Sequence, residues 1–320
     1  MSTGEKFAQM LIAVALFFAV VAVILLATQR LRSRTGELAQ SAAFILPAVA
    51  MISVGLLYPA IVTIYTSFRS ANGDEFVGLE NYQTIFTDDA QIQVLINTAL
   101  WVLIVPTAST AIGLVYAVLI DRARFEKFAK ALIFLPMAIS LVGASIIWKF
   151  VYDYRDSSRE QIGLANQILK SFGFETYRFL QEAPWNTLFL IVIMIWVQAG
   201  FAMTILSASI KAIPDDIIEA ARLDGVSGFK MFRFITVPSI RPSLIVVLTT
   251  ISITTLKAFD IVRTTTGGNF DTSVLADQFY FQSFRAFNDG LGAALGVLIF
   301  LLVIPIVVYN VRQMRKLEAR

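Results

Sequence analysis

The sequence has no cysteine and no histidine, and only 15% of its 320 residues are charged. Without cysteine there is no disulfide and no thiolate nucleophile or metal ligand. Without histidine there are no imidazole metal ligands and no general base of the kind most common near neutral pH. The net charge is only +3, and it is not gathered into a basic nucleic-acid footprint. These absences argue against an enzyme and against a nucleic-acid partner.

Hydrophobic residues, by contrast, make up 57% of the chain. About 20 consecutive apolar residues span a bilayer as a helix, because the backbone polar groups must bond internally in lipid. The sequence therefore predicts an all-α, multi-pass integral membrane protein with about seven transmembrane helices. The uncharged runs cover 7–28, 41–68, 91–120, 131–148, 183–210 and 291–311, with a weaker candidate at 243–262.

The first apolar run also has some features of a cleaved signal peptide. It is longer than a signal peptide requires, and Arg30, Arg32 and Arg34 follow it. We therefore favour a retained helix, although cleavage of residues 1–28 stays open. The expected organisation is an additional transmembrane helix with a basic cytoplasmic link over 1–40, followed by a main transmembrane domain over 41–320.

The loops between these runs differ in their lysine and arginine content. One alternating set carries roughly twice as many of these residues as the other. Because basic loops stay in the cytoplasm, we expect the N-terminus outside, the C-terminus inside and the 211–242 loop in the cytoplasm.

The 211–242 loop contains residues that favour the start of a helix and residues that favour its end. Pro214 suits a first helical position, and Gly225 suits a left-handed helix end. Ser227 can cap a second short helix, which Pro238 and Pro242 limit. Periodicity alone leaves two alternatives open: an amphipathic segment lying on the bilayer, or a docking site for a partner protein.

The segment EAARLDGVSGFKMFRFITVP, residues 219–238, resembles the EAA loop of ATP-binding-cassette importer permeases. The matching residues are Glu219, Ala220, Ala221, Asp224, Gly225, Phe232, Ile235 and Pro238. Residues 76–86, 134–152, 162–169 and 264–284 are similar to segments of the carbohydrate branch of these permeases. The resemblance covers roughly residues 40–320 and leaves the first apolar run as an addition.

In such permeases this loop couples to a cytoplasmic ATPase. The resemblance implies that Glu219 is a charged contact and Gly225 the turn, that Ala220 and Ala221 allow close approach, and that Phe232 is an anchor. Asp224 and Pro238 belong to the same predicted coupling set.

The resemblance also implies an assembly in a prokaryotic cytoplasmic membrane. Its expected partners are a second homologous permease, an ATPase dimer, an external solute-binding protein and membrane lipids. No phosphate-binding loop of the G-x-x-x-x-G-K-[ST] type is present. ATP and Mg²⁺ would therefore be bound by the partner ATPase, and this chain would hold no cofactor or metal and would not itself be an enzyme.

The resemblance further favours import of an oligosaccharide of the maltose or α-glucoside type. Glycerol phosphate or a polyol is the alternative solute. A seven-helix receptor with Lys257 as a Schiff-base lysine, or a channel, is a further alternative. The final apolar run, where such a lysine belongs, contains none.

Polar groups within spans are candidates for the solute pathway, because burying them in lipid is costly. Lys257 and Asp260 lie three residues apart and can form a local ion pair on one helix face. With the threonines of the same segment they favour a span that lines the interior of the helix bundle, and a local pair near the outer interface is the alternative. The other expectation is a platform of aromatic rings and an amide, as suits a sugar, with ordinary helix packing as the alternative. The full candidate set is Trp196, Gln198, Phe201, Thr254, Lys257 and Asp260.

Overall fold

The computed structural model describes residues 19, 22–23, 45–120, 125–156 and 158–318. Within these residues every regular element is a helix, and the one β-type contact is an isolated bridge between Arg69 and Phe76. The all-α prediction is confirmed. The chain divides into two compact units, Met1–Tyr65 and Thr66–Arg320, which are described separately.

The described part of the first unit is mainly helical and belongs to a helix that is described over Ile45–Thr66. It contains a π-helical turn, η1 (Ser53–Leu57), followed by α3 (Tyr58–Thr66). Apolar side chains are exposed on all of its sides. A helix that is apolar all round is stable when lipid or other protein surrounds it.

The second unit contains the remaining described elements. They are α4 (Glu80–Thr87), α5 (Asp89–Ile120), α6 (Glu126–Phe134), η2 (Leu135–Ala138), α7 (Leu141–Val151), α8 (Leu164–Ser171), α9 (Trp185–Lys211), α10 (Asp215–Leu223), α11 (Gly228–Met231), η3 (Phe232–Thr236), α12 (Val237–Ser239), α13 (Arg241–Leu256), α14 (Asp260–Thr265), α15 (Leu275–Phe284) and α16 (Asp289–Glu318).

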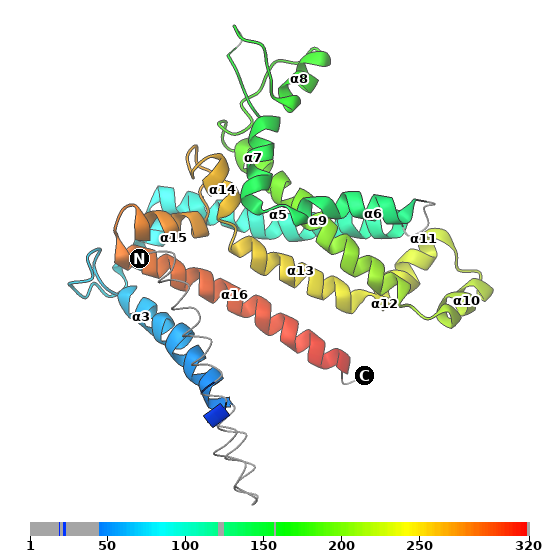
Figure 1. The fold of residues 1–320 in the computed structure, drawn as a ribbon, viewed down its shortest axis with the longest axis horizontal. Coiled ribbons are helices and arrows are strands. Elements are labelled where there is room, and N and C mark those ends of the chain that lie inside the picture. The colour runs from blue at the N-terminus through cyan, green and yellow to red at the C-terminus, as the bar shows by residue number, and fades with distance from the viewer. Residues whose placement is uncertain (1–18, 20–21, 24–44, 121–124, 157, 319–320) are drawn as a thin grey trace, which may run out of the picture. The chain divides into compact units, whose positions relative to one another are not determined.

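The long helices α5 and α9 pack side by side and form the framework of this unit (Figure 1). Their backbones lie close together at Gly113, where an added Cβ would lie 2.5 Å from the Cβ of Ala202 and 2.7 Å from the backbone nitrogen of Met203. Small residues permit such close approach between membrane helices. Helix α13 packs against α5 and α9, and α16 packs against α13.

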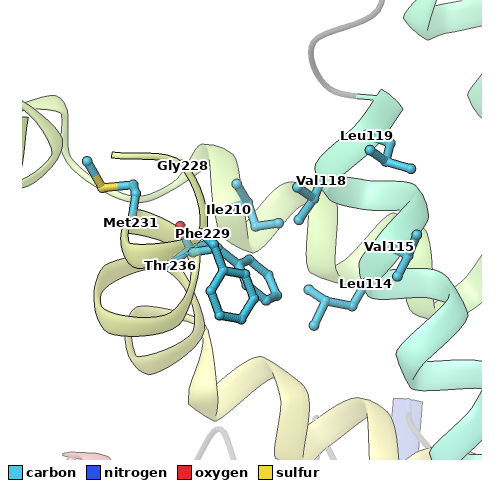
Figure 2. A pocket seen from close by; sticks show the side chains of 10 residues that line it. Leu114, Val115, Val118, Leu119, Ile210, Gly228, Phe229, Met231 and Thr236 are labelled. Carbon is cyan, nitrogen blue, oxygen red and sulfur yellow. The ribbon is translucent and has the colours of Figure 1, made fainter. Parts of the chain in front are cut away.

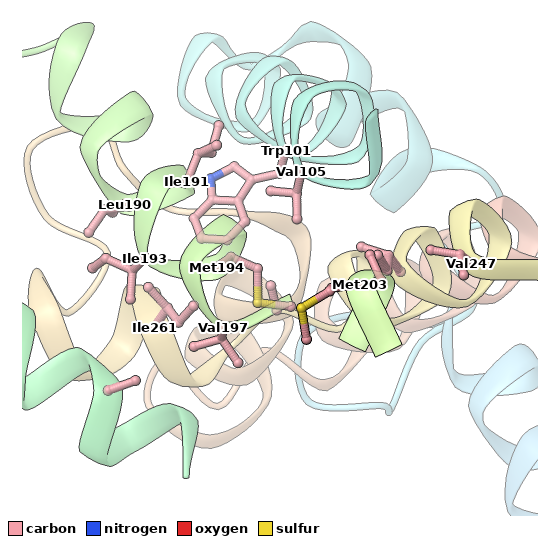
Figure 3. Close-up of a cluster of buried hydrophobic side chains, with 14 of the residues drawn as sticks. Trp101, Val105, Leu190, Ile191, Ile193, Met194, Val197, Met203, Val247 and Ile261 are labelled. Carbon is pink, nitrogen blue, oxygen red and sulfur yellow. The ribbon is translucent and has the colours of Figure 1, made fainter. Parts of the chain in front are cut away.

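A continuous apolar core lies between these helices (Figure 3). Trp101 and Val105 of α5 face Met194 of α9, with Val247 of α13 and Ile261 of α14 in the same cluster. Each of these five side chains is almost completely buried. The cluster holds the helices in a fixed arrangement from which the connecting loops project.

Two of the predicted spans are broken rather than straight. The run predicted at 131–148 comprises Glu126–Ala138 and Leu141–Val151, which meet at an angle of 101°. Pro136 lies in the intervening 3-10 turn, and the hydroxyl of Ser140 accepts a hydrogen bond from the Gly143 amide to start the second helix. Proline removes a helical hydrogen bond and is a usual cause of such bends.

The run predicted at 243–262 also differs in extent. Its helix ends at Leu256 and is preceded by Gly228–Ser239 at an angle of 69°. In the part of the chain that the structure describes, four helices are long and apolar enough to cross a membrane, or six when each bent pair is one span. The predicted run at 7–28 lies outside the described residues apart from three positions. The seven-span count and the orientation remain predictions.

Candidate functional site

The predicted coupling loop forms two short helical segments joined by a tight turn. Gly225 has a φ of +78°, the left-handed conformation expected of a glycine that ends a helix. The amide of Gly225 donates to the carbonyl of Arg222 at 3.0 Å, and the amide of Val226 donates to that of Ala221 at 2.9 Å. These two bonds make a Schellman motif. The turn is therefore defined by backbone hydrogen bonds.

The helix ends differ from the prediction in two details. Pro214 is the N-cap residue of α10 and not its first helical residue. Ser227 is the N-cap residue of α11, but its side chain makes no capping hydrogen bond. Its carbonyl accepts instead from the amides of Lys230 and Met231. The helix beyond it runs on through η3 and α12 and ends at Ser239, between Pro238 and Pro242.

Helix α10 is attached to the core by a few apolar residues and is exposed elsewhere. Ile213 and Ala221 are buried, and Ile218 packs against the core cluster. Of the predicted coupling residues, Glu219, Ala220, Asp224, Gly225 and Pro238 are exposed. We call the exposed part of residues 215–239 the coupling surface.

Several exposed apolar side chains on the coupling surface were not among the predicted coupling residues, and two of them are the most exposed. Leu223 is 90% exposed and Phe229 is 74% exposed. Exposure of large apolar groups marks an interaction surface more strongly than the exposure of small residues does. Periodicity could have singled out Leu223, because it lies on α10 away from the face that Ile218 and Ala221 bury.

The predicted anchor, Phe232, is half-buried and lines an apolar pocket of about 450 Å³ under this segment. Its ring lies 6.1 Å from that of Phe229. Figure 2 shows side chains of α5, Leu114 and Val115 among them, facing the 228–236 segment across this pocket. Phe232 therefore shares this pocket with residues of α5 and lies at the edge of the coupling surface.

The candidate pathway residues fall on neighbouring elements, since α9 contacts both α13 and α14. Trp196 packs edge-on against Trp148 at 5.8 Å, and both it and Phe201 lie against the core cluster. Gln198 is half-buried. The hydroxyl of Thr254 donates to the carbonyl of Thr250 at 3.0 Å. These four residues thus have packing roles compatible with either alternative stated above.

Lys257 and Asp260 do not form the expected pair on one helix face. Helix α13 ends at Leu256, Lys257 is its exposed C-cap residue, and Asp260 begins α14. The three-residue spacing predicts an ion pair only in a continuous helix, and the break at 257–259 removes that geometry.

The loops at the opposite end of the helices are held by buried asparagines. The side-chain amide of Asn97 donates to the carbonyls of Asp271 and Ser273 at 2.6 and 2.9 Å, and that of Asn186 donates to the Phe270 carbonyl at 2.6 Å. Phe270 and Asp271 both have a φ of +57°. The two amides bind the carbonyls of this left-handed turn and so hold the 270–273 loop on α5 and α9.

A buried carboxyl group lies in the same loop region. Burial raises the pKa of Asp277, while a hydrogen bond from Ser273 and the charge of Arg263 act in the opposite direction. The Arg263 guanidinium also lies over the ring of Tyr280, 5.0 Å from its centroid.

The loop between α7 and α9 contains the short helix α8, which begins at Leu164. Asn166 on α8 is fully buried and binds the carbonyls of Asp153 and Tyr177. This end of the molecule is therefore a rigid scaffold.

Residues 90–317 match the family model of binding-protein-dependent transport system inner membrane components. The chain belongs to this family. The resemblance to an importer permease is thereby confirmed, as is the expectation of a multi-pass protein of the inner membrane. The EAA-type loop falls within the matched residues.

Two relatives are similar over most of their length. The osmoprotective compounds uptake permease protein GgtC of a Synechocystis species is 46% identical over 86% of this chain and 99% of its own. The alpha-glucoside transport system permease protein AglF of Rhizobium meliloti is 46% identical over 84% of this chain and 80% of its own.

A solved structure has the same fold. It is that of a bacterial ABC transporter involved in the import of the acidic polysaccharide alginate, with a TM-score of 0.72 and 21% identity. The match covers 86% of this chain and 94% of the solved chain.

Proposed function

We propose that this chain is one of the two permease subunits of an ATP-driven importer for an oligosaccharide of the α-glucoside type. The observation that carries the proposal is the coupling surface. It is a rigid, exposed helical hairpin that projects from a membrane helix bundle in a chain of the binding-protein-dependent transport family.

The hairpin supports contact with a cytoplasmic ATPase. Its Schellman turn transmits displacement because two backbone hydrogen bonds resist bending. Glu219 offers a charge, and Leu223 and Phe229 offer apolar area to a cleft. ATP and Mg²⁺ would be bound by that partner, since this sequence has no phosphate-binding loop.

The mechanism that follows is alternating access. Closure of the ATPase dimer would move α10 and α11, and the two permeases would rock against each other and open the shared cavity outward. An external binding protein would then deliver the solute, and hydrolysis would restore the inward-facing state. The solved relative in complex with an alginate pentasaccharide-bound periplasmic protein supports a docking role for the outer loops.

The solute class rests on the relatives. AglF is named for alpha-glucosides, and a trehalose/maltose permease of Thermococcus litoralis is 29% identical over 87% of this chain. The GgtC relative is named for osmoprotective compounds, which makes such a solute the second candidate. Competition of trehalose, maltose and glycerol 3-phosphate against labelled α-glucoside uptake separates these classes.

The assembly is tested by mild-detergent purification of the tagged chain from its own membranes, with mass spectrometry of what accompanies it. We expect a cytoplasmic ATPase and a second permease, both lost when Glu219 and Gly225 are replaced together. Recovery of a folded chain without partners would contradict the proposal. It would favour the alternative interpretation, in which the loop is an amphipathic segment lying on the bilayer.

Among the pathway candidates, Asp260 gives the sharpest test. Asp260→Asn should lower uptake roughly ten-fold while the ATPase stays bound, because hydrogen bonds from sugar hydroxyls to a carboxylate are worth about 1.5–3 kcal/mol. Glu175→Gln, an exposed carboxylate in the outer loop, is the matched control. Loss of the bound ATPase in Asp260→Asn would instead make Asp260 a structural residue.

A further inference from the structure

A second pocket at the coupling-loop end of the helices has a charged rim and an apolar floor. It has a volume of about 510 Å³ and lies between α6 and α9. Lys127, Lys130 and Lys211 contribute the charge, and Ala131, Phe134 and Met203 contribute apolar surface. None of these residues is used in the coupling or pathway roles proposed above.

Two of the three lysines form ion pairs with one carboxylate, that of Glu126. Glu126 pairs with Lys130 at 3.0 Å and also with Lys211 from the end of α9. Lys130 additionally donates to the hydroxyl of Ser207. Helices α6 and α9 thus bring three ammonium groups to one pocket, and Glu126 bridges two of them.

The lysines and the apolar residues of α6 that line the pocket lie on the same face of the helix. Lys127, Lys130, Ala131 and Phe134 recur three and four residues apart, so they share one face of the helix. Elsewhere on the same short helix, Phe128 and Leu132 are exposed. A soluble anion such as inorganic phosphate would use only the rim, whereas an amphiphile would use the rim and the floor.

We propose that this pocket binds an anionic phospholipid. Its phosphate lies among Lys127, Lys130 and Lys211, and the start of an acyl chain packs on Phe134 and Met203. Basic pockets between membrane helices bind anionic headgroups, and each lysine near the headgroup contributes about 1 kcal/mol. The site does not depend on which solute is carried. It makes the permease sensitive to the composition of the bilayer.

The test is the thermal melting of the purified importer in detergent, titrated with short-chain phosphatidylglycerol or phosphatidylcholine. We expect phosphatidylglycerol alone to raise the melting temperature. Lys127→Gln should raise the concentration of phosphatidylglycerol that gives half of the full effect roughly five-fold, as follows from about 1 kcal/mol per lysine. Lys170→Gln on α8 is the matched control and should leave it unchanged.

Glu126→Gln distinguishes a ligand site from a structural ion-pair network. Removing the carboxylate makes the net charge of the pocket more positive by one, so phosphatidylglycerol should bind more tightly even though the lipid-free protein melts lower. If Glu126→Gln and Lys127→Gln weaken the lipid effect equally, or if both lipids act alike, the proposal is wrong. Equal stabilisation by inorganic phosphate would assign the site to a free anion instead.

Discussion

We expect Gly225→Val to abolish solute uptake by the assembled importer while the chain still inserts and folds. Gly225 has a φ of +78°, and an added Cβ would meet nothing within 4 Å. The defect is therefore confined to the backbone: a β-branched residue disfavours the left-handed conformation and opens the Schellman turn. Uptake of a labelled α-glucoside in vesicles, with chain yield by size-exclusion chromatography, measures both effects.

Gly225→Asn is the control for this prediction, because asparagine tolerates the left-handed region. It should keep most of the uptake. Glu219→Ala should abolish uptake without backbone strain, since Glu219 is exposed and its loss leaves the fold intact. Normal uptake in both Gly225→Val and Glu219→Ala would remove the coupling role from this loop.

Gly113→Val prevents accumulation of the folded permease. The Cβ of any residue at this position would approach the Ala202 Cβ at 2.5 Å and the Met203 backbone nitrogen at 2.7 Å. Backbone cannot rotate away as a side chain can, so α5 and α9 must separate along the interface that holds the core. Overpacking typically costs about 1–3 kcal/mol, and we expect at least the upper end here.

The measurement is the yield and melting temperature of the detergent-solubilised chain. Gly55→Val is the matched control, because Gly55 is also helical and an added Cβ would meet nothing within 4 Å there. In a Gly113→Ala chain, Ala202→Gly should restore part of the lost stability by removing the contact with the Ala202 Cβ, one of three close contacts. An unchanged melting temperature for Gly113→Val would mean that the two helices can shift apart at little cost.

The features that were predicted correctly from the sequence depend only on residues that are close together along the chain. Apolar runs long enough to span a bilayer indicate membrane helices whatever surrounds them. Gly225 ends α10 as predicted, because a left-handed helix end is a property of the local backbone. The spacing of the EAA-type residues likewise lies within one contiguous segment.

The predictions that were wrong assumed continuous helices. Lys257 and Asp260 were expected on one helix face, but the break between α13 and α14 separates them. The 131–148 run was predicted as one span, and it bends by 101° near Pro136. Periodicity does not show that a helix stops and restarts when both parts are apolar.

The sequence by itself determined the all-helical membrane class, the position of the coupling loop and the family. Only the tertiary structure decided which residues meet. Asn97 holds the 271–273 loop from α5, and Glu126 joins the lysines of α6 and α9. The physical reason is distance along the chain: helices and turns form from residues a few positions apart, whereas these contacts exist only after whole helices have packed.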